Sequence, residues 1–347
     1  MKVLLLTPKV YSLSEMLSDG FNDNGWKSCI VDYKYIISNK INRIYEKTAG
    51  LPRKITKSWK SYYYRLINNE YNKIFDIEKP NIVLIYNNQF IFPETIERFK
   101  KSAKIVFYLG DNPLWSKTFD YNLNILKYAD LILSPDSHWQ FELKMIGIPN
   151  VECDHIGYSR KRFFIVSNIP ETFQNRYKSD LIFIGRNYLS SPGYKRTIFL
   201  NKFSGMSMKI FGGNSWNYWL KHFPELKQHY NMMQHRISDE ELNYAINCAK
   251  IYPIDQNPGI INGIHVRVFE AIGAGALPIM EWRKDIDKTF NGLLPVIKNY
   301  NEARRIAEYY LQSEDIREKK VEELKNYLNK VYTPSLYVKR LISYLNI

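Results

Sequence analysis

One segment, residues 257–279, concentrates side chains that could bind a phosphorylated ligand. Arg267 and Glu270 lie three residues apart, so on a helix they would share one face near its first turn. Arginine is a bidentate donor to phosphate, a carboxylate can accept hydrogen bonds from both hydroxyls of a ribose, and a helix N-terminus offers free N–H groups. The spacing therefore predicts a sugar-nucleotide site, but it also fits an ordinary ion pair on a helix surface.

The surrounding sequence favours a binding site. A loop with proline and glycine precedes the predicted helix, and residues 277–280 follow as a buried strand. Gly273 and Gly275 would allow the helix to pack tightly. These glycines follow a helix and precede a strand, the reverse of the dinucleotide-binding order, so the segment does not predict an NAD site.

Together with two upstream motifs, this segment resembles a known family. Residues 267–278 read RVFEAIGAGALP, after Phe183-Ile-Gly-Arg186 and Gly212-Gly213. Over roughly residues 130–312 the order and spacing resemble GT-B glycosyltransferases, in the CgeB-like branch of the GT4-like group. The resemblance implies two Rossmann-like domains facing a cleft, and transfer of a sugar from a nucleoside diphosphate to a glycan or glycoconjugate acceptor.

The resemblance also assigns roles to residues. In that family the glutamate matching Glu270 binds the ribose, and Arg186 with Lys195 or Arg196 would contact the diphosphate. Main-chain groups in the stretch that begins at Arg236 would read the base. The remaining expected donor-site residues are Gly213, Ile237, Asn262 and His265.

Asn262 departs from the family pattern. GT4-like members commonly carry a glutamate eight residues before the ribose glutamate, where it touches the donor sugar, and this chain has Asn262 there. The CgeB-like branch tolerates the change, and we favour retention of the anomeric configuration. The same departure leaves room for a catalytically silent protein of this fold that binds a sugar nucleotide or associates with a spore or other surface.

Asp111 is the candidate catalytic residue of the first half, with Arg267 as its counterpart in the second. It follows a strand predicted over residues 105–109, and Asp111-Asn-Pro113 resembles the Asp-Asn/Asp-Pro of the same family. Asp111 could orient or deprotonate an acceptor hydroxyl; alternatively, Asp-Asn-Pro is a turn that caps the next helix. His138 opens another predicted helix, and a lone histidine is more often structural.

We expect neither a metal nor a cofactor. There is no P-loop, zinc-protease or nucleophile-elbow motif, and Asp285-Ile-Asp287 matches D-x-D in letters but follows the wrong element. Instead, Arg186, Arg267 and a helix N-terminus would stabilise the departing diphosphate.

Short apolar runs alternate with amphipathic segments, which predicts α/β architecture with two doubly wound parallel sheets. Helices are expected over residues 12–24, over 238–249 after a Ser238–Glu241 capping box, and over 303–324. The predicted domains are 1–168 on the acceptor side, 169–330 for the nucleotide sugar, and 331–347 as a helix returning to the first domain. The predicted strands are 2–7, 28–32, 82–86, 105–109, 131–134, 181–184, 208–211, 251–253, 277–280 and 294–297.

Composition sets the remaining expectations. The 347 residues are 45% hydrophobic, enough for two cores, and no apolar run is long enough for a signal peptide or membrane span. Three isolated cysteines argue against a disulfide framework, so we expect a protein of the reducing cytoplasm, engaged in assembling cell-surface polysaccharide or glycoprotein. The net charge of +14 suggests acidic partners.

Much of this charge lies in residues 34–79, which hold 11 Lys+Arg and 4 Asp+Glu together with Trp59 and Tyr62-Tyr63-Tyr64. The simplest interpretation is a pair of solvated helices covering the first sheet. Peripheral contact with an anionic membrane or an acidic acceptor is the alternative. Nucleic-acid motifs are absent, so the expected partners are a nucleotide-sugar donor and a glycan, lipid-linked or protein acceptor, with no nucleic acid.

Overall fold

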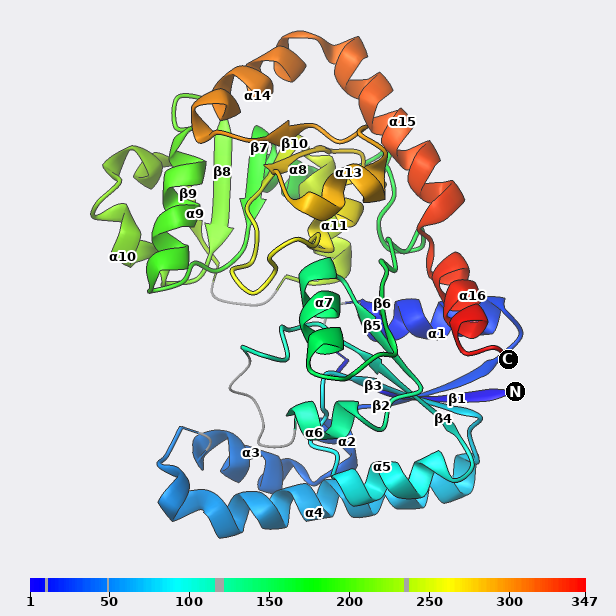
Figure 1. Ribbon diagram of the computed structural model, residues 1–347. Coiled ribbons are helices and arrows are strands. Elements are labelled where there is room, and N and C mark those ends of the chain that lie inside the picture. The colour runs from blue at the N-terminus through cyan, green and yellow to red at the C-terminus, as the bar shows by residue number, and fades with distance from the viewer. Residues whose placement is uncertain (10–11, 49, 116–121, 234–236) are drawn as a thin grey trace. The chain divides into compact units, whose positions relative to one another are not determined.

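The computed structural model describes residues 1–9, 12–48, 50–115, 122–233 and 237–347, which form two compact units (Figure 1). Unit 1 comprises Met1–Ile156 and Pro334–Ile347, and unit 2 comprises Gly157–Thr333. Each unit contains a six-stranded sheet whose strand pairs are parallel. The predicted fold class, two doubly wound α/β domains, is confirmed.

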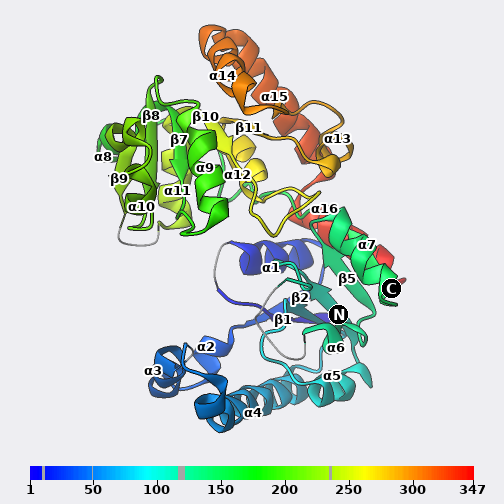
Figure 2. The ribbon, with the colours of Figure 1, turned by 60° about the vertical axis from the view of Figure 1, so that its left-hand side comes forward.

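In unit 1, α1 (Leu13–Asp23) and α16 (Pro334–Tyr344) cover one face of the sheet, and α4 (Arg53–Glu78) and α5 (Pro93–Lys100) cover the other (Figures 1 and 2). The strand order is β2-β1-β3-β4-β5-β6. The strands are β1 (Lys2–Leu6), β2 (Lys27–Val31), β3 (Ile82–Tyr86), β4 (Lys104–Tyr108), β5 (Leu131–Ser134) and β6 (Val151–Cys153). The remaining helices are α2 (Tyr33–Ile36), α3 (Asn39–Thr48), α6 (Asn122–Leu126) and α7 (Ser137–Met145).

The last helix, α16, is part of the core of unit 1. Its side chains Tyr337, Val338 and Leu341 are fully buried against α1 and the sheet. Gly20 lets the two helices approach, because a Cβ there would overlap the Pro334 carbonyl. Since Pro334 begins this helix, the predicted 331–347 segment differs from the structure by a few residues at its start.

Unit 2 has the strand order β12-β11-β10-β7-β8-β9. Its strands are β7 (Ser179–Ile184), β8 (Met208–Gly212), β9 (Tyr230–Met232), β10 (Ala249–Ile254), β11 (Leu277–Glu281) and β12 (Val296–Ile297). One face packs on α9 (Ser191–Asn201), α10 (Trp216–Leu220), α14 (Ala303–Gln312) and the 3-10 turns η1 (Pro224–His229) and η2 (Tyr300–Glu302). The other packs on α8 (Glu171–Tyr177), α11 (Asp239–Asn247), α12 (Arg267–Gly273), α13 (Lys284–Phe290) and α15 (Glu314–Val331).

The boundary between the units differs from the predicted one at 168/169. Tyr158 and Phe163 are fully buried in the core of unit 2, so the chain enters that unit at Gly157. The predicted helix over residues 303–324 is two helices, because Ser313 has a non-helical backbone (φ −120°, ψ 81°). Glu314 and Asp315 then occupy the first turn of α15, where carboxylates stabilise a helix start.

Every predicted strand overlaps an observed one, whereas β6 and β9, three residues each, were not predicted. The Ser238 hydroxyl accepts a hydrogen bond from the Glu241 amide, as the capping box requires. Within the described ranges, none of the helices combines the length and apolarity that crossing a bilayer requires.

Candidate active site

The predicted donor-site residues gather at the carboxyl edge of the sheet of unit 2. Strand β7 lies between β8 and β10. The chain adds β8 and β9 on one side of β7 and then adds β10, β11 and β12 on the other side, so the direction in which strands are added reverses between β7 and β10. Open α/β sheets bind ligands outside the carboxyl ends of strands at such a reversal. The loops after β7 and β10 carry Arg186 and His265, and Arg267 begins the helix that follows β10.

Arg267 is held against the end of β7. Its guanidinium carbon lies 5.8 Å from the centre of the Phe183 ring. A Cβ added to Gly185 would lie 3.1 Å from both terminal nitrogens of Arg267, so the glycine leaves room for this side chain. The next residue, Arg186, is exposed. Two arginines therefore stand at the edge where a diphosphate is expected.

Arg196 has a different environment. Its Nε lies 2.8 Å from Asp255 Oδ2, in an ion pair whose side chains are 7% and 5% exposed. The guanidinium also donates to the Arg186 carbonyl and stacks 4.9 Å from the Tyr188 ring centre. Arg196 therefore uses donors for hydrogen bonds to Asp255 and to the Arg186 carbonyl, and it is buried. Its main role in the structure is to stabilise the loop after β7.

Two buried oxygen acceptors, one on Asp255 itself and one on the next residue, have no donor among the residues that the structure describes. Asp255 Oδ1 and Gln256 Oε1, directly after β10, have no hydrogen-bond partner in the described part of the chain. An unpaired buried acceptor costs about 1–3 kcal/mol, so a ligand that brings hydroxyl or N–H donors to this point would be favoured. Sequence reasoning missed both residues; the signal that could have found them is a polar pair directly after a buried strand.

Burial changes the protonation of Glu270 and His265. Loss of hydration raises the pKa of Glu270 to about 7, opposed by Arg267 and reinforced by Asp239. Burial, with the charges of Arg267 and Arg196, lowers the pKa of His265 to about 3, so its ring is neutral. The Arg267 amide donates a hydrogen bond to His265 Nδ1 at 3.2 Å. The proton of the neutral ring is therefore on Nε2, which can donate to a ligand.

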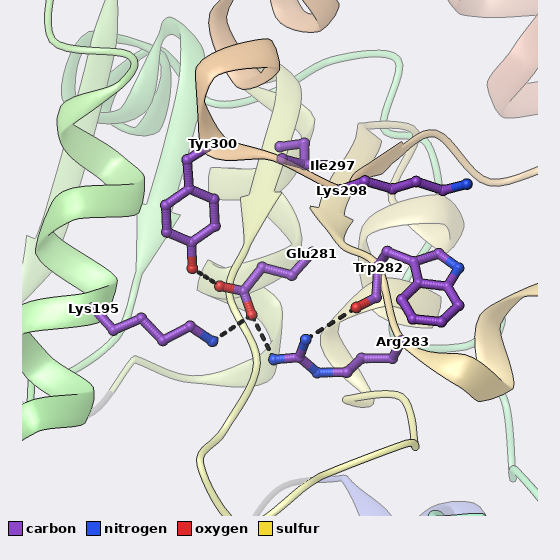
Figure 3. A pocket seen from close by; sticks show the side chains of 7 residues that line it. All are labelled: Lys195, Glu281, Trp282, Arg283, Ile297, Lys298 and Tyr300. Carbon is purple, nitrogen blue, oxygen red and sulfur yellow. Dashed lines mark hydrogen bonds and ion pairs between the residues drawn. The ribbon is translucent and has the colours of Figure 1, made fainter.

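Lys195 forms an ion pair with Glu281 (Figure 3). Its Nζ lies 2.8 Å from Glu281 Oε2, and Arg283 donates to the same oxygen at 2.8 Å. The Tyr300 hydroxyl donates to Oε1. The structure therefore places Lys195 in a second cluster, and neither Lys195 nor Arg196 is an unengaged partner for the diphosphate.

The other predicted donor-site residues are placed less distinctively. Gly213 follows β8, where a Cβ would have room, 3.9 Å from Arg186 Cγ. The Asn262 carbonyl accepts from the Asp285 amide at 3.0 Å, which ties the loop after β10 to α13. Ile237 packs partly buried against the core under α12. Arg236, at the start of the expected base-reading stretch, lies outside the described residues.

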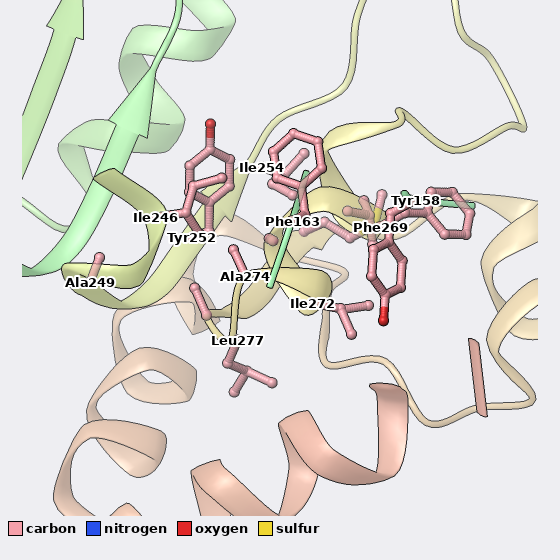
Figure 4. Packing of buried hydrophobic residues seen from close by; sticks show 14 of the residues in the cluster. Tyr158, Phe163, Ile246, Ala249, Tyr252, Ile254, Phe269, Ile272, Ala274 and Leu277 are labelled. Atoms are coloured by element: carbon pink, nitrogen blue, oxygen red, sulfur yellow. The ribbon is translucent and has the colours of Figure 1, made fainter. Parts of the chain in front are cut away.

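The underside of α12 is held by tight packing (Figure 4). Tyr158, Phe163, Phe269 and Ile272 lie in one buried cluster. A Cβ on Gly273 would overlap the Tyr158 ring, and Gly275 has a φ of +90°. The predicted need for small residues here is confirmed, and this packing fixes the helix that carries Arg267 and Glu270.

The comparisons with known proteins identify the fold. Residues 196–343 match the family model described as glycosyl transferase-like. The fold resembles sucrose-phosphate synthase from Thermosynechococcus elongatus with a TM-score of 0.70, 9% identity and coverage of 99% of each chain. The chain has the GT-B fold.

Other solved structures match over similar lengths. An E. coli structure described as trehalose-6-phosphate bound with UDP-2-fluoro glucose matches with a TM-score of 0.66 and 9% identity, covering 99% of each chain. A putative UDP-N-acetylglucosamine 2-epimerase from Listeria monocytogenes matches with a TM-score of 0.60 and 12% identity, covering 99% of this chain and 95% of the other. No curated protein matches the sequence. The GT-B, GT4-like resemblance is confirmed, and the CgeB-like branch stays a prediction.

In this GT-B chain Asp111 belongs to unit 1, whereas the residues above belong to unit 2. Asp111 is exposed, and Asn87 Nδ2 donates to its Oδ2 at 2.9 Å. Asn87 Oδ1 also accepts from the Gly110 amide at 2.7 Å, so one side chain holds the whole turn after β4. His138 Nε2 lies 3.8 Å from Glu142, one turn along α7. Among the residues described, no three His, Cys, Asp or Glu side chains are grouped as a metal site.

Proposed function

We propose that this protein transfers a sugar from a nucleoside-diphosphate sugar to a glycan or glycoconjugate acceptor without a metal ion. The observation that carries the proposal is the placement of Arg186, Arg267 and Glu270 around the winding reversal of a GT-B unit. The match to the glycosyl transferase-like family covers the segment that holds Arg267 and Glu270. Assembly of cell-surface polysaccharide or glycoprotein in the cytoplasm is the setting we propose for it.

Each of these residues has a role in the proposed reaction. Glu270 would accept hydrogen bonds from the ribose, and Asp255 Oδ1 with Gln256 Oε1 would accept from donor hydroxyls. As the bond from the sugar to the diphosphate breaks, Arg186 and Arg267 would stabilise the negative charge on the leaving phosphate. Asp111 would orient the attacking acceptor hydroxyl. We favour retention at the anomeric carbon, with attack from the face that the diphosphate leaves and transfer of the hydroxyl proton to the departing phosphate.

The direct test is calorimetry with UDP, GDP and their sugars, followed by analysis of the products. Saturable binding and formation of a glycoside would support the proposal. Because a putative 2-epimerase shares the fold, the 2-epimer as product with no glycoside would replace it with isomerisation. Binding without turnover would identify a catalytically silent sugar-nucleotide-binding protein, and no binding would contradict all three.

EDTA is expected to leave the rate of transfer unchanged. The leaving diphosphate is proposed to be neutralised by Arg186 and Arg267, so a divalent ion is not needed for that role. The rate is measured with the best donor before and after chelation, and again after Mg²⁺ or Mn²⁺ is restored. Activity that vanishes with EDTA and returns with either ion would show that a divalent cation neutralises the leaving diphosphate.

We also propose that the α3–α4 end of unit 1 contacts an anionic membrane. One face of α4 is buried through Tyr63, Ile67 and Tyr71, so this helix does cover the sheet. Apolar side chains nevertheless remain exposed beside many basic residues. They are Tyr35 (73% exposed), Ile44 (41%), Leu51 (47%), Ile55 (74%) and Tyr62 (48%). Exposed apolar groups with surplus positive charge are typical of surfaces that rest on anionic lipid.

Reversing Lys40, Lys47 and Lys57 to glutamate is expected to release the protein from such membranes. Each basic residue near anionic lipid contributes about 1 kcal/mol, and the attraction fades over a Debye length of about 8 Å at physiological salt. The measurement is co-sedimentation with vesicles of phosphatidylglycerol and phosphatidylcholine across a salt series.

The matched control reverses three exposed lysines of unit 2, Lys221, Lys319 and Lys330. If both triple variants and the parent sediment alike, or if vesicles of phosphatidylcholine alone are bound as well, the exposed face of α4 is only the solvated cover of the sheet.

A further inference from the structure

A cavity of about 490 Å³ opens in unit 2 beside the ends of β11 and β12 (Figure 3). Glu281, at the end of β11, points to the face covered by α9 and α14, because Ile279, two residues earlier, packs there. Glu270 and α12 lie on the opposite face. The cavity shares no residue with the proposed nucleotide site; its lining residues are Lys195, Glu281, Trp282, Arg283, Ile297, Lys298 and Tyr300.

The cavity carries a surplus of positive charge. Glu281 is 4% exposed and brings Lys195 Nζ and Arg283 to one carboxylate oxygen, each at 2.8 Å. Lys298 also lines the cavity, but Figure 3 shows its ammonium extending away from Glu281, so the lining holds three cations and one carboxylate and two of the cations contact that carboxylate. Lysine has three N–H donors and arginine five, and the carboxylate uses one from each. Arg283 Nη1 also donates to the Trp282 carbonyl at 3.0 Å, and the donors that remain on Lys195 and Arg283 can meet a second anion.

The wall on the Arg283 side is aromatic. Trp282 lines the cavity with 38% of its surface exposed, and its Nε1 lies 3.3 Å from Asp287 Oδ2, which orients the ring. Figure 3 shows Lys195 and Tyr300 on the other side of Glu281 from Trp282. A flat apolar surface beside converging charged donors suits a ring that carries an anionic group.

We propose that this cavity binds a sugar bearing a phosphate or a carboxylate, as a second ligand in addition to the nucleotide sugar. The anionic group meets the remaining donors of Lys195 and Arg283, Lys298 adds positive charge to the same lining, and the sugar ring lies against Trp282. The volume falls within the range of small-molecule sites. The proposal does not depend on which nucleotide the first site binds.

The test is calorimetry on the full chain with glucose 6-phosphate and glucuronate, which distinguish phosphate from carboxylate, and with glucose and inorganic phosphate as partial ligands. At least one anionic sugar is expected to bind saturably at millimolar concentration or below, with UDP present or absent. The double variant R283Q/K298Q is expected to bind it at least tenfold more weakly and UDP unchanged. K202Q, at the other end of α9, is the matched control and is expected to bind both ligands as the parent does.

A second variant separates the sugar from its charge. W282A is expected to lose affinity for the anionic sugar but not for inorganic phosphate, and it keeps the proposal testable if the double variant unfolds. Displacement of the anionic sugar by UDP would place it in the nucleotide site and overturn the proposal. So would the absence of saturable binding, or inorganic phosphate binding as tightly as either anionic sugar. UDP binding is measured separately, so failure here is distinct from failure of the proposed transferase activity.

Discussion

Glu270→Gln is expected to stabilise the folded protein at pH 8 by about 3 kcal/mol. The carboxyl ionises near 4.5 in the unfolded chain and at about 7 in the folded protein, where burial disfavours its charge. One pKa unit corresponds to about 1.36 kcal/mol. Between these two pKa values folding takes up a proton, so stability falls as pH rises, and above pH 7 the whole penalty is present. Glutamine carries no such penalty.

The measurement is denaturant unfolding of the parent and E270Q at pH 4, 6 and 8. The two curves are expected to agree near pH 4 and to separate progressively toward pH 8. E322Q, at an exposed position on α15, is the matched control and is expected to follow the parent at every pH. A variant less stable than the parent at pH 8 would mean that the Glu270 charge is compensated by partners stronger than burial.

The same substitution is expected to weaken binding of a nucleotide sugar. Loss of hydrogen bonds to a charged acceptor costs about 1.5–3 kcal/mol, which is about a tenfold to hundredfold loss of affinity. For the parent, affinity should rise from pH 6 to pH 8 as the carboxylate forms, whereas E270Q should bind independently of pH. A nucleotide sugar has no phosphate that titrates in this range, and His265 is neutral throughout. Equal affinities would remove Glu270 from the donor site.

Arg196→Ala is expected to destabilise unit 2 by about 3–5 kcal/mol, because it leaves the buried carboxylate of Asp255 without its charge partner. Arg186→Ala, at an exposed position, is expected to leave stability nearly unchanged and to lower donor affinity. Unfolding free energies and donor titrations of both variants separate the structural arginine from the binding one.

The double variant R196A/D255A completes the test. It is expected to be more stable than R196A alone, because no uncompensated charge remains. If R196A is as stable as the parent but fails to bind the donor, Arg196 contacts the diphosphate directly, as the family resemblance implied.

The sequence predicted features formed by residues that are close together along the chain, but not contacts between residues that are far apart. Strands such as β3 and β7 are continuous apolar runs, and the Arg267–Glu270 pair sits within one short motif, so both were visible locally. The pairs Arg196–Asp255 and Lys195–Glu281 join residues 59 and 86 positions apart. No local pattern marks such pairs, and they decide which basic residues remain available to a ligand. The polar pair after β10 is visible in the sequence as a pattern, but only the structure shows that its oxygens are buried and lack partners in the described part of the chain.

The position of α16 has a consequence for the order in which the protein is made. Unit 2 is one continuous stretch, Gly157–Thr333, whereas the core of unit 1 needs Tyr337, Val338 and Leu341, which follow unit 2 in the sequence. During synthesis, unit 1 therefore starts before unit 2 and is completed after it, and α1 stays uncovered until residues 334–347 have left the ribosome. A chain that ends at Thr333 and has left the ribosome would carry a complete unit 2 and a unit 1 open on one face, which is a state for chaperones to recognise.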